Sequence, residues 1–195
     1  PRSARRPDRP GEPQMDEPQR RQREAWDRRS ADYDTWIATL ERRFLGATRP
    51  WVCGRAHGDV LEVAGGTGLN LPHYPPDVAL TFTDLSGSML DVARRRAAAL
   101  ERDAEFGVAD AMALPFPDAS FDSVVCTFAL CGVPHVDGAL TEALRVLRPG
   151  GSLLLADHVV STAAPARVVQ RGLDLVTGRT HGEYWTRRPL LALQA

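Results

Sequence analysis

The sequence contains no lysine, and every one of its 24 basic residues is an arginine. This bias is typical of a GC-rich bacterial genome, so we assign it no function. The chain also lacks an excess of charge of one sign, since its formal net charge is −1 at pH 7. A balanced charge gives no strong attraction to a phosphate backbone, so we expect no nucleic acid as principal partner.

Cysteine is also scarce. Cys53, Cys126 and Cys131 are odd in number and lack metal-site pairing, which predicts reduced thiols, a cytoplasmic location and no metal. A site made by Cys126, Cys131 and His135 would match no strong zinc signature, so buried thiols are the better interpretation. No apolar run reaches the roughly 20 residues that span a bilayer, and no apolar N-terminal segment predicts a signal peptide. We therefore expect no transmembrane segment.

Length and composition predict one domain with two N-terminal additions. A chain of 195 residues that is 43% hydrophobic is long enough for one sizeable core. Residues 1–24 combine prolines, charges and glutamines, which predicts a disordered tail. Residues 25–57 place apolar side chains at helical intervals, which predicts a helical segment packed on the main domain at 58–195. Tyr33 in this segment is a candidate ligand contact.

From Gly58 onward, apolar runs of strand length alternate with helical stretches. Such alternation predicts a doubly wound, Rossmann-like α/β domain with a mostly parallel sheet and helices on both faces. Sheets of this kind bind ligands at the carboxyl ends of their strands. The expected strands are 59–64, 79–84, 104–110, 121–130 and 151–160, and the expected helices between them include 86–101 and 136–147.

A glycine-rich turn follows the first expected strand. In "VLEVAGGTGLN", residues 60–70, the glycines let the backbone come close to a ligand above the strand ends. The dinucleotide pattern G-x-G-x-x-G fails in either register, because leucine occupies its last glycine position. Pro72 and Pro75 also cut short the helix that a pyrophosphate would need. The turn is therefore suited to a nucleoside without phosphates.

Two acidic residues lie at the ends of the next strands. Asp84 ends the second strand about 20 residues beyond the turn, where a carboxylate can accept both hydroxyls of a ribose. Asp110 ends the third strand at the same edge of the sheet. For either acid alone, a solvated residue at a strand end is an equally good explanation. Together with the turn, the two acids indicate a nucleoside site.

These residues resemble the motifs of the class I S-adenosylmethionine-dependent methyltransferases. "LEVAGGTG" is similar to the first motif, with Ala64 replacing the first glycine, and "TDLSGSML" is similar to the motif after the second strand. "ADAMALPFPDASFDSVV" resembles the adenine-side loop and fourth strand, and "EALRVLRPGGSLLL" resembles the helix, turn and fifth strand. The resemblance covers residues 58–160 and is closest to the quinone and phosphatidylethanolamine methyltransferases.

The resemblance implies S-adenosylmethionine as cofactor, with S-adenosylhomocysteine as its product. The turn would pass under the methionine part, Asp84 would take the ribose hydroxyls, and Asp110 would accept from the exocyclic amine of adenine. Glu62 would lie near the methionine end. The implied cofactor residues are Glu62, Ala64, Gly65, Gly66, Gly68, Asn70, Asp84, Leu85, Met89, Asp110, Ala111, Met112, Thr127 and Phe128, with Tyr33 added from the helical segment.

The function that follows is methyl transfer to a small-molecule, quinone or lipid acceptor. A general base is optional, and the candidates are His158 and His135, which follow the fifth and fourth strands. For either histidine, a structural or exposed side chain is the commoner finding. Two other functions stay open, namely a cofactor-binding protein without transferase activity and a nicotinamide oxidoreductase.

The end of the chain departs from the family, which usually closes its sheet with two further strands. The sequence stops before them, so the fifth strand, with "SLLLA" at its centre, would be an apolar sheet edge. Such an edge offers unpaired backbone groups to another chain. We therefore expect a homo-oligomer formed through this edge, or coverage of the edge by residues 162–185, with a longer natural chain supplying the absent strands.

Overall fold

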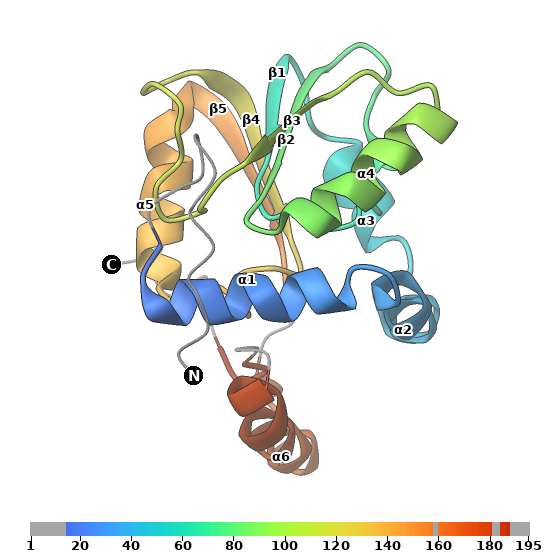
Figure 1. Cartoon of the computed structure of the whole chain (residues 1–195), viewed down its shortest axis with the longest axis vertical. Helices are drawn as coiled ribbons and strands as arrows, with labels where there is room; N and C mark the ends of the chain where they lie inside the picture. The colour runs from blue at the N-terminus through green and yellow to red at the C-terminus, as the bar shows by residue number, and fades with distance from the viewer. Residues whose placement is uncertain (1–14, 158–159, 181–183, 188–195) are drawn as a thin grey trace, which may run out of the picture.

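The computed structural model describes residues 15–157, 160–180 and 184–187, and its centre is a five-stranded sheet (Figure 1). The strand order is β3-β2-β1-β4-β5, and every pairing is parallel. This arrangement confirms the predicted doubly wound α/β fold. The strands are β1 Asp59–Glu62, β2 Ala79–Asp84, β3 Glu105–Val108, β4 Phe121–Thr127 and β5 Leu147–Ala156.

The strand order reverses at the centre of the sheet. Val60 of β1 pairs with Leu80 of β2 on one side and with Ser123 of β4 on the other. Successive strands are added outward from β1 to β3 in one direction and from β4 to β5 in the other. The carboxyl ends of β1 and β4 therefore border the crevice in which sheets of this type bind ligands.

Two apolar clusters cover the two faces of the sheet. One cluster includes the fully buried Phe82 and residues of helix α4, Gly87–Ala99. The other includes the fully buried Val124 and residues of helix α5, Val136–Val146. Burying each large apolar side chain contributes about 1.5–3 kcal/mol, so both helices are held to the sheet mainly by these contacts.

The prediction of a disordered tail is wrong for residues 17–24, which belong to helix α1. Asp16 caps this helix, because its carboxylate accepts the backbone N–H of Gln19 at 2.9 Å while the Gln19 side chain accepts the Asp16 N–H at 2.7 Å. The composition of residues 17–24 did not indicate a helix, because this segment has few large apolar side chains to bury, although the capping box marks its start. Residues 1–14 of the predicted tail lie outside the described residues. The N-terminal helices are α1 Glu17–Arg29, α2 Tyr33–Leu40, the π-helical turn η1 Glu41–Leu45 and α3 Thr48–Cys53.

Strand boundaries differ from the sequence prediction where the backbone changes conformation. β1 and β4 end earlier than expected, and Ala64 and Phe128, which follow them, both have φ of +53°. β5 begins at Leu147, before the predicted position, with a shift of register between Phe121 and Ser123. A positive φ cannot continue a strand, which explains the two early ends.

β5 lies at the edge of the sheet, and within the described ranges no strand pairs with its outer side. Helix α6, Ala164–Thr180, projects beyond the carboxyl ends of the strands rather than along β5 (Figure 1). After α6, the backbone N–H of Tyr184 donates to the carbonyl of Cys131 at 3.0 Å. This part of residues 162–185 therefore lies on the loop after β4, contrary to the expected coverage of β5. In the described part of the chain, neither α6 nor another helix combines the length and apolar character needed to cross a bilayer.

The outer side of β5, with which no described strand pairs, generates a prediction about association. Because an unpaired apolar strand is a template for another copy, we expect a homo-oligomer that dissociates on dilution. Light scattering over a dilution series measures the mass, and hydrogen exchange should show β5 amides losing protection as the mass falls. A monomer at every concentration, with β5 amides protected throughout, would contradict pairing through this edge.

Candidate functional site

A cavity that is partly open to solvent lies at the carboxyl ends of the strands. Open α/β sheets typically bind ligands at this edge, in the crevice outside the carboxyl ends of the strands. Its walls come from the loops after β1, β2, β3 and β4 and from helices α1 and α2. The predicted cofactor residues that line it are Tyr33, Ala64, Gly66, Asp84, Leu85, Met89, Asp110, Ala111, Met112 and Phe128.

Gly66 supplies bare backbone to the cavity wall. It has φ of +62°, and a Cβ added to it would meet no protein atom within 4 Å. Its N–H donates to Asp84 Oδ2 at 2.9 Å, which ties the turn after β1 to the end of β2. A side chain at this position would occupy space that a ligand lying on the turn needs, so Gly66 fits the predicted cradle.

Gly65 and Gly68 serve packing instead. A Cβ on Gly65 would lie 2.2 Å from Cζ of Phe82, and a Cβ on Gly68 would lie 3.1 Å from Cβ of Ala93 in α4. Neither glycine is among the residues that line the cavity. These two glycines let the turn approach β2 and α4 closely. Of the turn residues that were predicted to bind the cofactor, Ala64 and Gly66 line the cavity.

Asp84 ends β2 at the cavity wall and is only 9% exposed. Its carboxylate accepts the backbone N–H groups of Gly66 at 2.9 Å and Ser86 at 2.8 Å. Burial raises the pKa of Asp84 from 3.8 to about 6, although these hydrogen bonds act in the opposite direction. Each carboxylate oxygen has a further lone pair, so Asp84 can also accept hydroxyl groups of a sugar.

Asp110 follows β3 and is also buried. Its Oδ1 accepts the backbone N–H of Met112 at 2.9 Å, and its Oδ2 accepts Nε2 of Gln19 from α1 at 2.5 Å. Leu85 and Met112 add apolar surface to the same cavity. A buried carboxylate beside apolar side chains is suited to bind the amine edge of a flat base.

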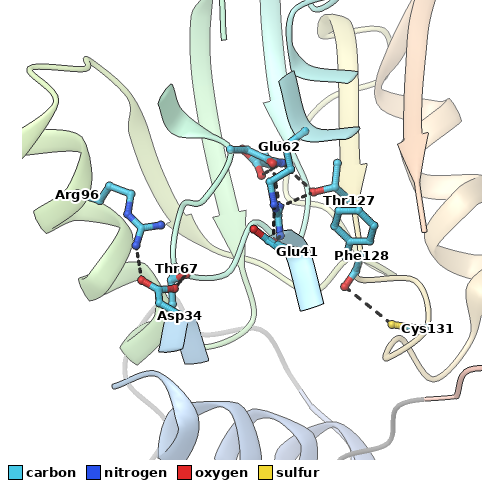
Figure 2. Close-up of polar contacts among 10 residues, drawn as sticks. Asp34, Glu41, Glu62, Thr67, Arg96, Thr127, Phe128 and Cys131 are labelled. Carbon is cyan, nitrogen blue, oxygen red and sulfur yellow. Dashed lines mark hydrogen bonds and ion pairs between the residues drawn. The ribbon is translucent and has the colours of Figure 1, made fainter. Parts of the chain in front are cut away.

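Three other predicted residues, Glu62, Asn70 and Thr127, form a buried polar network rather than cavity wall. Figure 2 shows Glu62 and Thr127 of this network. Nδ2 of Asn70 donates to Glu62 Oε1 at 2.7 Å and to Thr127 Oγ1 at 2.8 Å. The hydroxyl of Tyr74 donates to Glu62 Oε2 at 2.9 Å. Burial raises the pKa of Glu62 from 4.5 to about 7 despite these hydrogen bonds. The network thus supports the cavity wall from inside the domain.

Arg49 of α3 joins this network to the N-terminal helices. Its Nη1 donates to Asn70 Oδ1 at 2.8 Å and to Thr127 Oγ1 at 3.1 Å, and its Nε donates to Glu41 at 2.8 Å. The guanidinium carbon lies 4.9 Å from the ring centre of Phe128, within cation–π range. Arg49 therefore contacts Phe128, which follows β4 and lines the cavity.

Sequence reasoning missed most residues that the N-terminal helices bring to the site. Gln19, Gln22 and Trp26 line the cavity from α1, and Asp34 of α2 accepts the hydroxyl of Thr67 in the turn at 2.6 Å. The D-x-x-Q pattern at the start of α1 could have predicted the helix. No local signal showed that this helix lies over the strand ends.

The candidate general bases are not brought to the cavity by the described structure. His135 is exposed at the N-cap of α5 and is not one of the described residues that line the cavity. His158 lies outside the described residues. The three cysteines are buried and form no disulfide within the described residues, and burial raises the pKa of the Cys53 thiol from 9.0 to about 12.

Known proteins resemble this chain over the same region. Residues 61–155 match the family model described as "Methyltransferase domain". The ubiquinone/menaquinone biosynthesis C-methyltransferase UbiE of Dinoroseobacter shibae is 39% identical over 147 residues, covering 73% of this chain and 58% of the relative. This chain carries a class I S-adenosylmethionine-dependent methyltransferase domain. The predicted family resemblance is thereby confirmed.

Two further proteins are similar to this chain, one in sequence and one in structure. The phosphatidylethanolamine N-methyltransferase of Cereibacter sphaeroides is 40% identical over 118 residues, covering 60% of this chain and 58% of the relative. The solved structure of the YcgJ protein of Bacillus subtilis superposes with a TM-score of 0.63 at 27% identity, covering 76% of this chain and 64% of that one. The chain spans 58% of the length of both curated relatives.

The cavity of the methyltransferase domain fits S-adenosylmethionine, the cofactor of the family. A Cβ on Gly66 would enter the space where the backbone has to approach the cofactor. Asp84 and Asp110 offer buried carboxylates for the ribose hydroxyls and the exocyclic amine. These assignments of individual residues stay predictions, and two of them generate the following tests.

We expect Asp84→Asn to weaken binding of S-adenosylhomocysteine by roughly 1.5–3 kcal/mol, the usual contribution of a hydrogen bond to a charged group. Binding to the wild type should also weaken as pH falls below about 6, because the hydroxyls need an ionised carboxylate and the pKa of Asp84 is raised to about 6. Calorimetric titration at several pH values measures both effects. If the asparagine variant kept wild-type affinity and the same pH profile, Asp84 would not belong to the site.

Ala64 adopts a left-handed backbone, with φ of +53°. This conformation costs alanine about 1–2 kcal/mol, while glycine in its place costs about 0.5–1 kcal/mol of chain entropy. Ala64→Gly should therefore raise the free energy of unfolding by about 0.5–1 kcal/mol, as measured by urea denaturation. The matched control is Ala98→Gly on the exposed side of α4, which should lower it by about 0.5–1 kcal/mol. A loss of stability in both variants would refute strain at Ala64.

Proposed function

We propose that this protein transfers the methyl group of S-adenosylmethionine to a small-molecule acceptor of the quinone or phospholipid class. The observation that carries the proposal is the convergence of Gly66, Asp84 and Asp110 from three strand ends on one cavity. The acceptor class is supported by the curated relatives, which are named for ubiquinone/menaquinone biosynthesis and for phosphatidylethanolamine.

The residues of the site have to position the reactants and exclude water. A bound S-adenosylmethionine supplies a methyl group on a positively charged sulfur, which is already activated for transfer. Correct positioning of two reactants can lower the barrier by about 7–11 kcal/mol, so the proposal does not require a general base. Trp26, Tyr33 and Phe128 give the cavity large apolar side chains that exclude water around the reacting groups.

Methyl transfer from isotopically labelled S-adenosylmethionine tests the proposal directly. We expect label in a demethylated quinone or in vesicles that contain phosphatidylethanolamine, and strongly reduced transfer by Asp110→Asn at limiting cofactor. The asparagine keeps the shape of the side chain but loses its charge. The reaction product identifies the acceptor atom.

The same samples separate the alternative functions. Tight binding of S-adenosylhomocysteine with no transfer to any acceptor of the panel would favour a cofactor-binding protein without transferase activity. Binding of NADH with no binding of S-adenosylhomocysteine would favour a nicotinamide oxidoreductase and overturn the proposal.

We also propose a cytoplasmic location. All three cysteines are buried and form no disulfide in the described part of the chain, and proteins of oxidising compartments more often pair their thiols in disulfides. Fractionation of the source cells, with the protein detected by antibody, checks this location. Recovery in an oxidising compartment would contradict it.

A further inference from the structure

Helix α1 lies across the carboxyl ends of the strands (Figure 1). It is connected by side-chain hydrogen bonds to three loops, which follow β2, β3 and β4. The matched methyltransferase region begins at residue 61, so the family model gives no role to this helix. The three connections are from Ser86 Oγ to Asp27, from Gln19 Nε2 to Asp110 and from Gln22 Nε2 to the carbonyl of Gly132.

The same helix forms part of the cavity wall. Gln19, Gln22 and Trp26 line the cavity together with Asp84 and Asp110. A ligand that used both carboxylates would therefore lie beneath α1. The cavity is partly open to solvent, so movement of α1, or of the side chains on its inner face, would widen the path for such a ligand.

The two ends of α1 are attached differently. Near its C-terminal end, Asp27 Oδ1 accepts the hydroxyl of Ser86 at 2.5 Å and the backbone N–H of Ser88 at 3.3 Å. Near its N-terminal end, Gln19 donates to Asp110 Oδ2 at 2.5 Å. Loss of the Gln19 bond would free the first turn of α1 from the loop after β3, while Gln22 and Asp27 keep the rest of the helix attached, which is the geometry of a hinged lid.

Gln19 presents the same chemistry to Asp110 as adenine does. Its amide N–H group is a neutral donor to a buried carboxylate oxygen, and the exocyclic amine of adenine is also a neutral N–H donor. The other carboxylate oxygen already accepts the N–H of Met112 at 2.9 Å. Oδ2 keeps a second lone pair. Because Gln19 and Asp110 both line the cavity, however, the Gln19 amide occupies the side from which the amine of a base would approach.

We propose that α1 is a lid on the cofactor site and that Gln19 is its latch, which competes with adenine for Asp110 Oδ2. When the cofactor binds, its exocyclic amine replaces the Gln19 amide, and the N-terminal end of α1 is released from the loop after β3. Gln19 thereby sets the rate of cofactor entry. This inference rests on the proposed function, because it assumes that the base of the ligand is adenine.

Gln19→Met removes the amide donor at similar side-chain length, but it also removes the acceptor for the Asp16 N–H. The matched control is Asp16→Ala, which breaks the same capping box and leaves the Gln19 amide in place. We expect Gln19→Met to speed association of S-adenosylhomocysteine by roughly 10- to 150-fold, the factor that corresponds to one hydrogen bond to a charged group. Stopped-flow fluorescence measures this rate, because Trp26 lines the cavity.

The outcomes separate the latch from other roles of Gln19. Equal acceleration by Asp16→Ala would show fraying of the helix end and would overturn the latch. Weaker binding by Gln19→Met at an unchanged association rate would show that Gln19 contacts the cofactor, which also overturns it.

A measurement without ligand distinguishes failure of the latch from failure of the proposed function. If the wild type bound no S-adenosylhomocysteine, the proposed function would fail while the latch could still be tested by hydrogen exchange. We expect the amides of residues 17–22 to exchange faster in Gln19→Met than in Asp16→Ala. Equal exchange in the two variants would overturn the latch whether or not the cofactor binds.

Discussion

The buried carboxylate of Glu62 is the constraint on which the arrangement of the site depends. It ends β1 inside the domain, where an unsatisfied charge would cost several kcal/mol. Asn70 and Tyr74 satisfy it with hydrogen bonds, and Asn70 is held in turn by Arg49. Satisfying one buried acid therefore fixes the segment after the turn and connects it to α3.

The site consists of two parts that come from different regions of the sequence. The strand ends supply Gly66, Asp84 and Asp110, which lie within the matched methyltransferase region. The N-terminal helices supply one side of the cavity and hold the turn, since Asp34 of α2 accepts from Thr67 and forms an ion pair with Arg96 of α4 (Figure 2). The strand ends carry the predicted recognition groups, and the helices line the same cavity.

Backbone strain lies on both sides of the central crevice. Ala64 and Phe128 follow the two strands at which the sheet order reverses, and both have φ of +53°. Residues in this conformation persist where the surrounding structure determines it, and they are concentrated at functional sites. At each position the strand ends and the chain turns along the cavity wall. The left-handed backbone of Ala64 and Phe128 thereby places both residues in that wall.

The sequence by itself determined the order of strands and helices along the chain, the doubly wound fold and the position of Gly66, Asp84 and Asp110 at the strand ends. These features depend on local periodicity and on the rule that parallel strands end at one edge. Only the tertiary structure decided that Glu62, Asn70 and Thr127 support the wall from within and that α1 covers the cavity. Those roles depend on partners far apart in the chain, such as Gln19 with Asp110, and the composition of either segment does not specify such a pairing.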